Sequence, residues 1–187
     1  MPQVFENKHV RAVRIFTEGA TFDGLVSLTL LGRTLDELNA SSRIFLPLES
    51  PAVVSGEFPL ESSQLAVNKA SILFVLELDD PGTGQALPHN SPHARRFARS
   101  VLSLRLRGYR IDGHVQVVER GDALGRLNQA GHPFLALTSA SVVGPGIEFA
   151  TPFLAVNRNH VLFGQETFRL RAVMEEALVP ETRHTSD

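Results

Sequence analysis

The stretch that decides the fold covers residues 19–74 and reads GATFDGLVSLTLLGRTLDELNASSRIFLPLESPAVVSGEFPLESSQLAVNKASILF. Residues 108–163 repeat it without a gap, 89 positions later, and read GYRIDGHVQVVERGDALGRLNQAGHPFLALTSASVVGPGIEFATPFLAVNRNHVLF. About twenty positions are identical, among them Asp-Gly at 23–24 and 112–113, Leu-Ala-Val-Asn at 65–68 and 154–157, and Leu-Phe at 73–74 and 162–163. So many identities at one fixed offset indicate a tandem duplication.

The duplication divides the chain into two homologous units. We place unit 1 at residues 8–78 and unit 2 at residues 100–166. Turn-forming residues that include Asp79-Asp80-Pro81-Gly82 predict a flexible linker over 79–99. Apolar residues with helical spacing, ended by Pro180, predict a C-terminal helix over 167–180 and a tail over 181–187. Units this small have marginal cores, so we expect them to pack on each other or on other chains.

Each unit has the pattern of a small β structure. In unit 1 we predict strands at 10–17, 22–31, 43–48 and 52–58, followed by a hairpin of 64–67 with 71–78. A helical turn is predicted at 34–39, and a weaker one at 122–128 in unit 2. Glycine inside a strand marks a bulge or bend, and bent strands close small barrels. The predicted fold is mostly β, with two small-barrel-like units, a short helical turn in each and a C-terminal helix.

Composition excludes several classes of protein. The 187 residues contain no cysteine, so there is no disulfide, thiolate metal site or cysteine nucleophile. The formal net charge of −2 gives no overall attraction to nucleic acid or to acidic membranes. No apolar stretch is long enough to span a bilayer, and the first residues lack the pattern of a signal peptide. We expect a cytoplasmic protein that does not contact membranes.

The motifs of the unit resemble two known families. Phe/Ile-Asp-Gly, a Leu-x-x-Leu-Asn helical turn, Phe-Leu-x-Leu and Leu-Ala-Val-Asn resemble a bacterial domain family of unknown function, which implies no catalytic residues. The order of elements is more distantly similar to Sm-like small β-barrels. In that comparison Gly24 and Gly113 match the internal glycine, and Asn39 and Asn128 match an asparagine. Asn68-Lys69 and Asn157-Arg158 stand where Sm-like proteins carry Arg-Gly, and this resemblance implies RNA binding.

An arginine-rich segment is the first candidate binding site. It consists of Arg95, Arg96, Arg99, Arg105, Arg107 and Arg110, with no acidic residue among them. From residue 102 to 107 leucines alternate with Ser103 and two of these arginines, which predicts a strand with one basic face. Such a face is typical of a solvated edge strand that charge protects from aggregation, and equally of a patch that binds RNA, DNA or an acidic protein.

A second candidate is the amide-cation pair at the turn of each predicted hairpin. Asn68 and Lys69 occupy it in unit 1, and Asn157 and Arg158 in unit 2. The pair is an ordinary turn sequence, or else a repeated cation for phosphate or an acidic partner. The remaining repeated polar residues have similar alternatives, since Asp-Gly forms bulges and Asn caps helices.

The sequence contains no recognisable catalytic or metal-binding constellation. No serine lies in Gly-x-Ser-x-Gly, no phosphate-cradling loop precedes a helix, and the histidines match no metal-ligand spacing. We therefore expect no enzymatic activity, no cofactor and no metal. The predicted role is a binding or scaffold module whose partner is another protein or a second copy of the chain. The alternative is a nucleic-acid-binding protein of Sm-like type.

Overall fold

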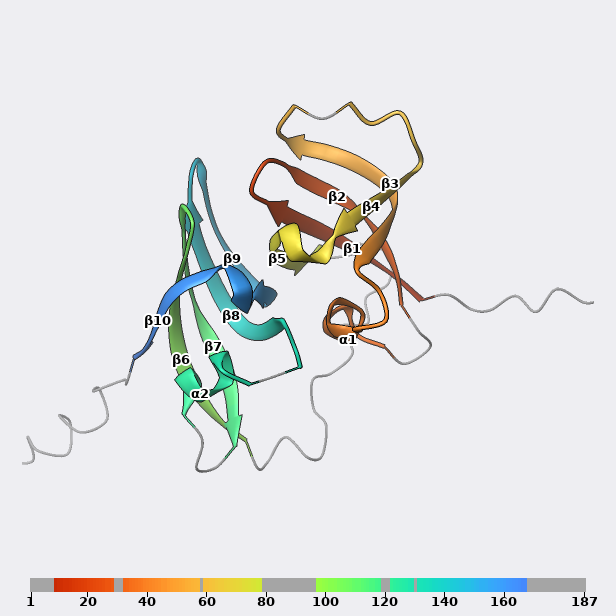
Figure 1. Cartoon of the computed structure of the whole chain (residues 1–187). Helices are drawn as coiled ribbons and strands as arrows, with labels where there is room; N and C mark the ends of the chain where they lie inside the picture. Colours follow the sequence, from red (N-terminus) through yellow and green to blue (C-terminus); the bar gives the residue numbers. More distant parts are fainter. Residues whose placement is uncertain are drawn as a thin grey trace, which may run out of the picture.

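The fold is mostly β. The structure is a computed structural model and describes residues 9–28, 32–57, 59–78, 97–118, 122–129 and 131–167. Over these residues it forms one ten-stranded antiparallel sheet, with two short α-helices and two 3-10 turns (Figure 1). The predicted fold class is thus confirmed at this level, whereas the predicted C-terminal helix falls almost entirely on residues outside the described ranges.

The two units contain the same succession of elements. Unit 1 consists of β1 (His9–Thr17), β2 (Thr21–Leu28), α1 (Thr34–Asn39), β3 (Phe45–Ser55), β4 (Gln64–Asn68), the 3-10 turn η1 (Lys69–Ser71) and β5 (Ile72–Glu77). Unit 2 consists of β6 (Phe97–Leu106), β7 (Tyr109–Val118), α2 (Ala123–Leu127), β8 (Phe134–Gly144), β9 (Ile147–Asn157), η3 (Arg158–His160) and β10 (Val161–Thr167). Both helices, both 3-10 turns and the strands β3/β8 and β5/β10 begin 89 positions apart, so we call residues with this spacing equivalent.

The strand order shows how the units are joined. It runs β10-β6-β7-β8-β9-β5-β1-β2-β3-β4, so each unit contributes five neighbouring strands and its last strand lies beside its first. The units meet where β9 pairs antiparallel with β5, with Phe74 opposite Val156 and Val75 opposite Ala155. At the two ends of the sheet, β4 and β10 each have one neighbour among the described residues.

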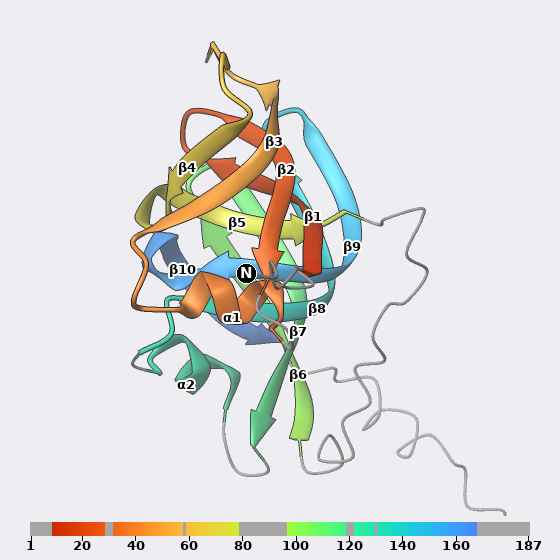
Figure 2. The same ribbon diagram turned by 90° about the vertical axis from the view of Figure 1, so that its right-hand side faces the viewer.

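The predicted hairpin of residues 64–67 with 71–78 is wrong, as is its counterpart in unit 2. β4 pairs with β3, whereas β5 pairs with β1 and β9, and no β4–β5 ladder exists in the described part of the chain. The three-residue turn η1 joins β4 to β5, which do not lie next to each other in the sheet, so it does not form a hairpin. Because so short a link joins the two outer strands of unit 1, the five strands curl until those strands meet at a corner (Figure 2). The sheet is bent but not closed.

Three further boundaries differ from the predictions. Residues 43–48 and 52–58 were predicted as separate strands, but β3 is continuous, with a kink at Ser50, whose φ is 48°. The equivalent Ser139 has the same φ within β8. β6 begins at Phe97, so the last residues of the predicted linker belong to a strand, and residues 79–96 lie outside the described ranges. Thr167, predicted as helical, ends β10.

The predicted bulge at Asp23-Gly24 is confirmed. The pairing of β2 with β3 shifts register between Asp23 and Leu25, and that of β7 with β8 shifts at the equivalent place. A Cβ atom on Gly24 would lie 2.5 Å from Cγ of Leu48, a buried residue of β3. Glycine therefore allows the two strands to approach each other at the bend.

We call the place where β9 of unit 2 pairs with β5 of unit 1 the joint. The hydrophobic core consists of two clusters, and each includes residues from the other side of the joint. Phe16, Phe74 and other residues of unit 1 belong to the cluster built mainly by unit 2. Phe134 and Ala155 of unit 2 belong to the cluster of unit 1. Phe74 stacks on Phe16 with ring centroids 4.3 Å apart and meets Tyr109 of unit 2 edge-on at 5.1 Å. Each unit therefore contributes side chains to the apolar cluster of the other.

Polar side chains complete the joint. Asn157 is buried, and its amide Nδ2 donates to the carbonyl oxygens of Lys69 at 3.2 Å and Ile72 at 2.9 Å. Asn39, at the end of α1, donates to the carbonyl of Phe134 at 3.0 Å and accepts from its N–H at 2.8 Å. The expected helix-capping role of Asn39 is wrong, because Ala40 is the C-cap and the Asn39 amide crosses to the other unit.

Candidate binding surface

The arginines of β6 lie on one face of the sheet. Leu102, Leu104 and Leu106 are buried, while Arg105 and Arg107 between and after them are exposed. This is the alternation that the sequence predicts, since successive side chains of a strand point to opposite faces. Arg99 is also exposed, whereas Arg95 and Arg96 lie outside the described residues. A basic face therefore exists on the outermost strands of unit 2.

Cross-strand pairing brings further side chains to Arg105. Its opposite residues are Arg110 on β7 and Phe163 on β10. Arg110 Nε and Asp112 Oδ2 form an ion pair at 2.7 Å, and Arg107 forms a longer ion pair of 3.6 Å with Glu18 of unit 1. Arg105 has no ion pair or hydrogen bond within the described ranges. Two adjacent guanidinium groups, one of them unpaired, favour an anionic ligand because they repel each other.

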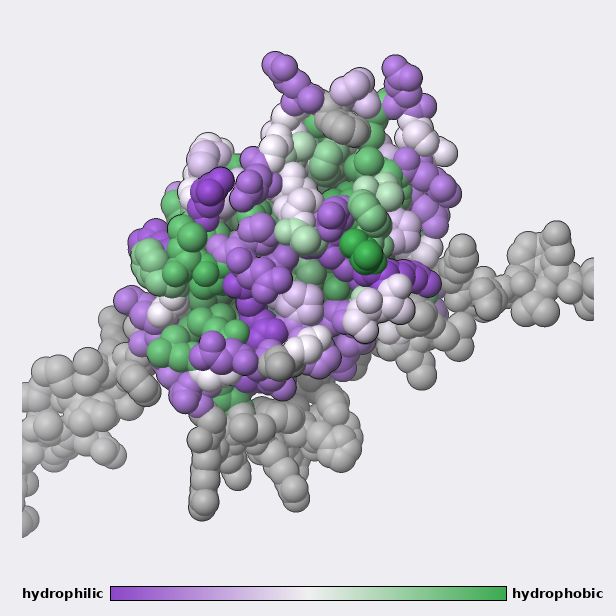
Figure 3. Space-filling model, in the orientation of Figure 1, coloured by the Kyte–Doolittle hydropathy of each residue, from purple (hydrophilic) through white to green (hydrophobic). Residues whose placement is uncertain are grey.

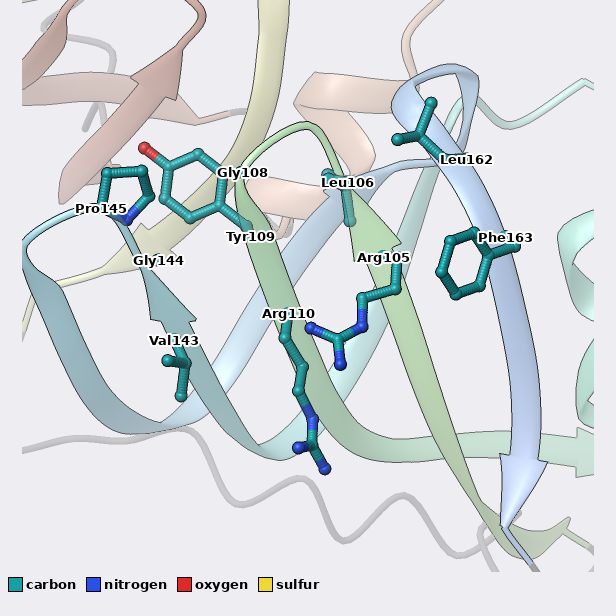
Figure 4. A pocket seen from close by; sticks show the side chains of 10 residues that line it. All are labelled: Arg105, Leu106, Gly108, Tyr109, Arg110, Val143, Gly144, Pro145, Leu162 and Phe163. Atoms are coloured by element: carbon teal, nitrogen blue, oxygen red, sulfur yellow. The ribbon is translucent and has the colours of Figure 1, made fainter.

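The basic face borders an apolar hollow at the end of the sheet. This hollow has a volume of about 720 Å³, and Arg105, Arg110, Leu162 and Phe163 line it together with residues of the β6–β7 and β8–β9 turns. Figure 4 shows the Arg105 side chain between the Phe163 ring and Arg110. Leu162 and Phe163 are among the most exposed large apolar residues of the protein, and Figure 3 shows apolar surface on the side where Figure 1 draws β10.

Sequence reasoning missed Leu162 and Phe163. Both are identical to the equivalent Leu73 and Phe74, which are buried at the joint, so residue type alone gives no sign of exposure. The signal that distinguishes them is their strand's position at the end of the sheet. That position depends on which strands pair across the two units, and a single sequence does not specify it.

Lys69 lies away from this surface and makes internal contacts. It is buried, and its Nζ donates to the carbonyl oxygens of Glu37 at 2.6 Å and Ala40 at 3.0 Å, which hold the end of α1. Burial lowers the pKa of Lys69 below its ordinary value of 10.5. Asn68 Oδ1 accepts from the N–H of Ala70 at 2.9 Å and so forms the turn.

Arg158 has the same arrangement in unit 2. Its Nη1 donates to the carbonyl oxygens of Arg126 and Leu127, both at 3.0 Å, at the end of α2, and its Nη2 donates to the carbonyl of His132. Desolvation, with a smaller contribution from Arg126, lowers the Arg158 pKa. The predicted amide-cation pairs thus lie in turns where each cation binds the carbonyls that end a helix. They are separate from the arginine face of β6.

The two repeated aspartates are paired with arginines. Asp23 accepts two hydrogen bonds from Arg14, at 2.7 and 2.8 Å, and Asp112 is bound by Arg110. His160 Nε2 lies 2.7 Å from the carbonyl oxygen of Ala70 across the joint. Over the described ranges, no three His, Asp or Glu side chains gather in a way that could hold a metal ion. Nor does a helix there have the length and apolar character needed to cross a membrane.

Comparison with known proteins gives no assignment. No family model matches the chain, and no similar protein was found among curated proteins or among solved structures. Function must therefore be inferred from the geometry of the chain itself.

Proposed function

We propose that the protein is a non-catalytic binding or scaffold module, made of two homologous small-barrel-like units that arose by tandem duplication. The recurrence of helices, 3-10 turns, strand bulges and the kinked serines at one offset supports the duplication. The unit resembles a small barrel because its five strands curl until its two outer strands, β4 and β5 in unit 1, meet at a corner.

One observation carries the binding role: the sheet ends in strands whose edge and neighbouring side chains are available to a partner. β10 presents Leu162 and Phe163 to solvent, and at the opposite end Ile44 and Phe45 are exposed beside β4. Exposed apolar groups next to an unpaired strand edge are a template for β-strand addition. A protein that kept such edges without a partner would be prone to aggregate.

Site-specific photocrosslinking in intact cells tests this proposal. A benzophenone amino acid replaces Leu162 in one variant and Val54, an exposed residue of β3 in unit 1, in the matched control. We expect protein adducts from position 162 in clear excess over position 54. Equal labelling at both positions, or none at either, would contradict a binding role for the β10 edge.

A second candidate function is nucleic-acid binding, which the Arg105–Arg110 pair beside an exposed aromatic ring supports. Guanidinium groups bind phosphates, and a ring such as Phe163 stacks on bases. The test is fluorescence anisotropy with labelled single-stranded RNA and duplex DNA at low and physiological salt. Arg105→Glu with Arg107→Glu is expected to abolish binding, whereas Arg11→Glu with Arg33→Glu, an equal charge change in unit 1, should weaken it far less.

Salt dependence provides the second criterion for this candidate. Binding through phosphates weakens as salt rises, because counterions released from the nucleic acid compete with the arginines. Absence of binding at low salt, where the attraction is strongest, would reject the nucleic-acid candidate and leave the protein-binding role standing.

A further inference from the structure

The two strands that pair at the joint contain short sequences that occur again at the free ends of the sheet. In the joint, Leu154-Ala155-Val156-Asn157 of β9 pairs with β5, which contains Leu73-Phe74. β4 has the same four residues at 65–68, and β10 has the same two at 162–163. The two free strands of the sheet are therefore equivalent to the two strands that already pair with each other inside the chain.

Burial separates the equivalent positions sharply. Leu73 and Phe74 are 2% and 0% exposed in the joint, whereas Leu162 and Phe163 are 68% and 64% exposed. The strands β8 and β3 show the same contrast at their first residues. Phe134 of β8 is 2% exposed, and its equivalent in β3, Phe45, is 50% exposed. The Leu-Phe and Leu-Ala-Val-Asn sequences of the joint are thus repeated at the sheet ends, where Leu162 and Phe163 are exposed. The joint residues Val75 and Leu76 are not repeated, because their equivalents are Gly164 and Gln165.

The backbone of β4 also fits such a contact. The N–H of Lys69 donates to Ile44 and that of Ser50 to the carbonyl of Ser63, so β4 alternates between groups that face β3 and groups that face outward. This alternation directs the N–H and C=O of Ala66 away from β3. Ala66 is equivalent to Ala155, which lies opposite Val75 in the joint. The residue equivalent to Val75 is Gly164, on the outer strand β10.

Polar groups of the joint have equivalents at the ends as well. Asn39 binds the backbone of Phe134 across the joint, while the side chain of its equivalent, Asn128, is exposed and has no hydrogen bond within the described residues. Asn157 crosses the joint with its amide, whereas the Asn68 side chain bonds only within its own turn. The free ends therefore carry donors and acceptors in the same positions as the closed joint.

We propose that the partner of these edges is a second copy of the chain, bound head to tail, with β4 of one molecule pairing antiparallel with β10 of the next. The register follows from the joint and places Val67 opposite Phe163 and Ala66 opposite Gly164. Because the two surfaces differ, the contact is heterologous and can repeat, giving a closed ring or a longer assembly. This inference rests on the proposed binding role and specifies its partner.

The matched sequences favour a second copy over an unrelated strand. β-Strand addition alone would require only the backbone edge, but here the Leu-Ala-Val-Asn sequence of the joint recurs on β4 and its Leu-Phe sequence on β10. A two-fold contact of β10 with β10 or of β4 with β4 has no counterpart within the chain. The head-to-tail contact has one, between β9 and β5.

The test uses the full-length protein and two double variants, each of which places charge on one edge. Leu162→Asp with Phe163→Asp changes the β10 edge, and Phe45→Asp with Ala66→Asp changes the β4 edge. All four side chains are exposed, so both variants should fold, which circular dichroism checks. Val54→Asp, at an exposed apolar position on β3, serves as the control.

Light scattering after size-exclusion chromatography gives the masses. We expect the unmodified chain and the Val54→Asp control to exceed the monomer mass at least about twofold, and each double variant to be monomeric. An equimolar mixture of the two double variants should form a 1:1 dimer and nothing larger, since each supplies the edge that the other lacks.

Other outcomes overturn the proposal. A monomeric unmodified chain, or double variants that keep its mass, would exclude this contact. A double variant that dimerises alone would show a two-fold contact of its intact edge in place of the head-to-tail one. The crosslinking experiment separates this failure from that of the proposed function. Adducts of position 162 with a different protein keep the binding role and reject self-association, whereas adducts with residues of β4 support both.

Discussion

Asn157 donates its side-chain amide to the carbonyl oxygen of Ile72 across the joint between the two units, at 2.9 Å, with the asparagine buried. The same amide donates to Lys69, so a single side chain satisfies two carbonyls of the other unit. The equivalent Asn68 makes no hydrogen bond to the described residues of the other unit. Its Oδ1 accepts a hydrogen bond from the backbone N–H of Ala70, two residues later in its own turn.

Replacement of Asn157 should therefore destabilise the chain more than replacement of Asn68. Asn157→Ala leaves the carbonyls of Lys69 and Ile72 without this donor in a buried place, and we expect the free energy of unfolding to fall by about 2–3 kcal/mol. Asn68→Ala removes one exposed turn contact and should cost about 0.5–1 kcal/mol. Urea unfolding of both variants in the Phe45→Asp/Ala66→Asp background, where association does not add to stability, measures the difference. Equal losses would show that the cross-unit hydrogen bonds do not stabilise the joint.

The local features of the unit were predictable from sequence, because short-range patterns encode them. Asp23-Gly24 predicted the bulge, and the leucine spacing of 34–39 predicted α1. Each of these depends on residues close in the chain, whose backbone preferences and side-chain periodicity determine the conformation.

Contacts between the units were not predictable in the same way. The pairing of β5 with β9 joins strands about eighty residues apart, and neither strand carries a local mark of its partner. The wrongly predicted hairpin around Asn68 is an example. Two apolar strands with a polar turn between them can pair with each other, but the same sequence pattern occurs where the turn joins the two outer strands of a curled sheet. The candidate site was found in part, through the arginine alternation, while Phe163 became visible only with the strand order.

Gly24 should not tolerate a side chain. In Gly24→Ala the new Cβ would lie 2.5 Å from Cγ of the buried Leu48, and the bent strand would have to move, at a cost of about 1–3 kcal/mol. Gly19→Ala is the matched control, because nothing lies within 4 Å of its Cβ position, and the change should stay within about 0.5 kcal/mol. Chemical denaturation of both variants decides this, and similar stabilities would indicate that β2 relaxes freely at the bulge.

Lys69 should titrate below its ordinary pKa of 10.5, because burial disfavours its charged form. The neutral amine still has two N–H donors, which suffice for the carbonyls of Glu37 and Ala40. Between the lowered folded pKa and 10.5 the unfolded chain binds more protons, so the free energy of unfolding should rise with pH in that window. Below the folded pKa this contribution does not change with pH.

Nuclear magnetic resonance can measure this titration directly. The sequence contains lysine only at positions 8 and 69, so a 13Cε spectrum has two lysine signals, and Lys69→Arg assigns the one that disappears. We expect the Lys69 signal to shift at lower pH in the folded protein than in urea. A midpoint at or above 10.5 in the folded protein would mean that the attraction of the Glu37 carboxylate balances or exceeds the desolvation of Nζ.

Phe74 and Phe163 are both phenylalanines in equivalent positions, but we expect their removal to change the free energy of unfolding by very different amounts. Phe74 stacks on Phe16 in the shared core, so Phe74→Ala should lower the free energy of unfolding by about 3–5 kcal/mol. Phe163 is exposed at the end of the sheet, so Phe163→Ala should change it by less than about 0.5 kcal/mol. Both are to be measured in the Phe45→Asp/Ala66→Asp background, because association would otherwise add to stability.

In the otherwise unmodified chain the same two substitutions should separate folding from assembly. Phe163→Ala is expected to lower the mass of the assembly while leaving the thermal unfolding of the monomer unchanged. Phe74→Ala acts on the core, so it should lower the unfolding temperature whatever the assembly state. If Phe163→Ala also destabilised the monomeric background by several kcal/mol, the Phe163 ring would belong to the core of its own molecule, and β10 would not be a free edge.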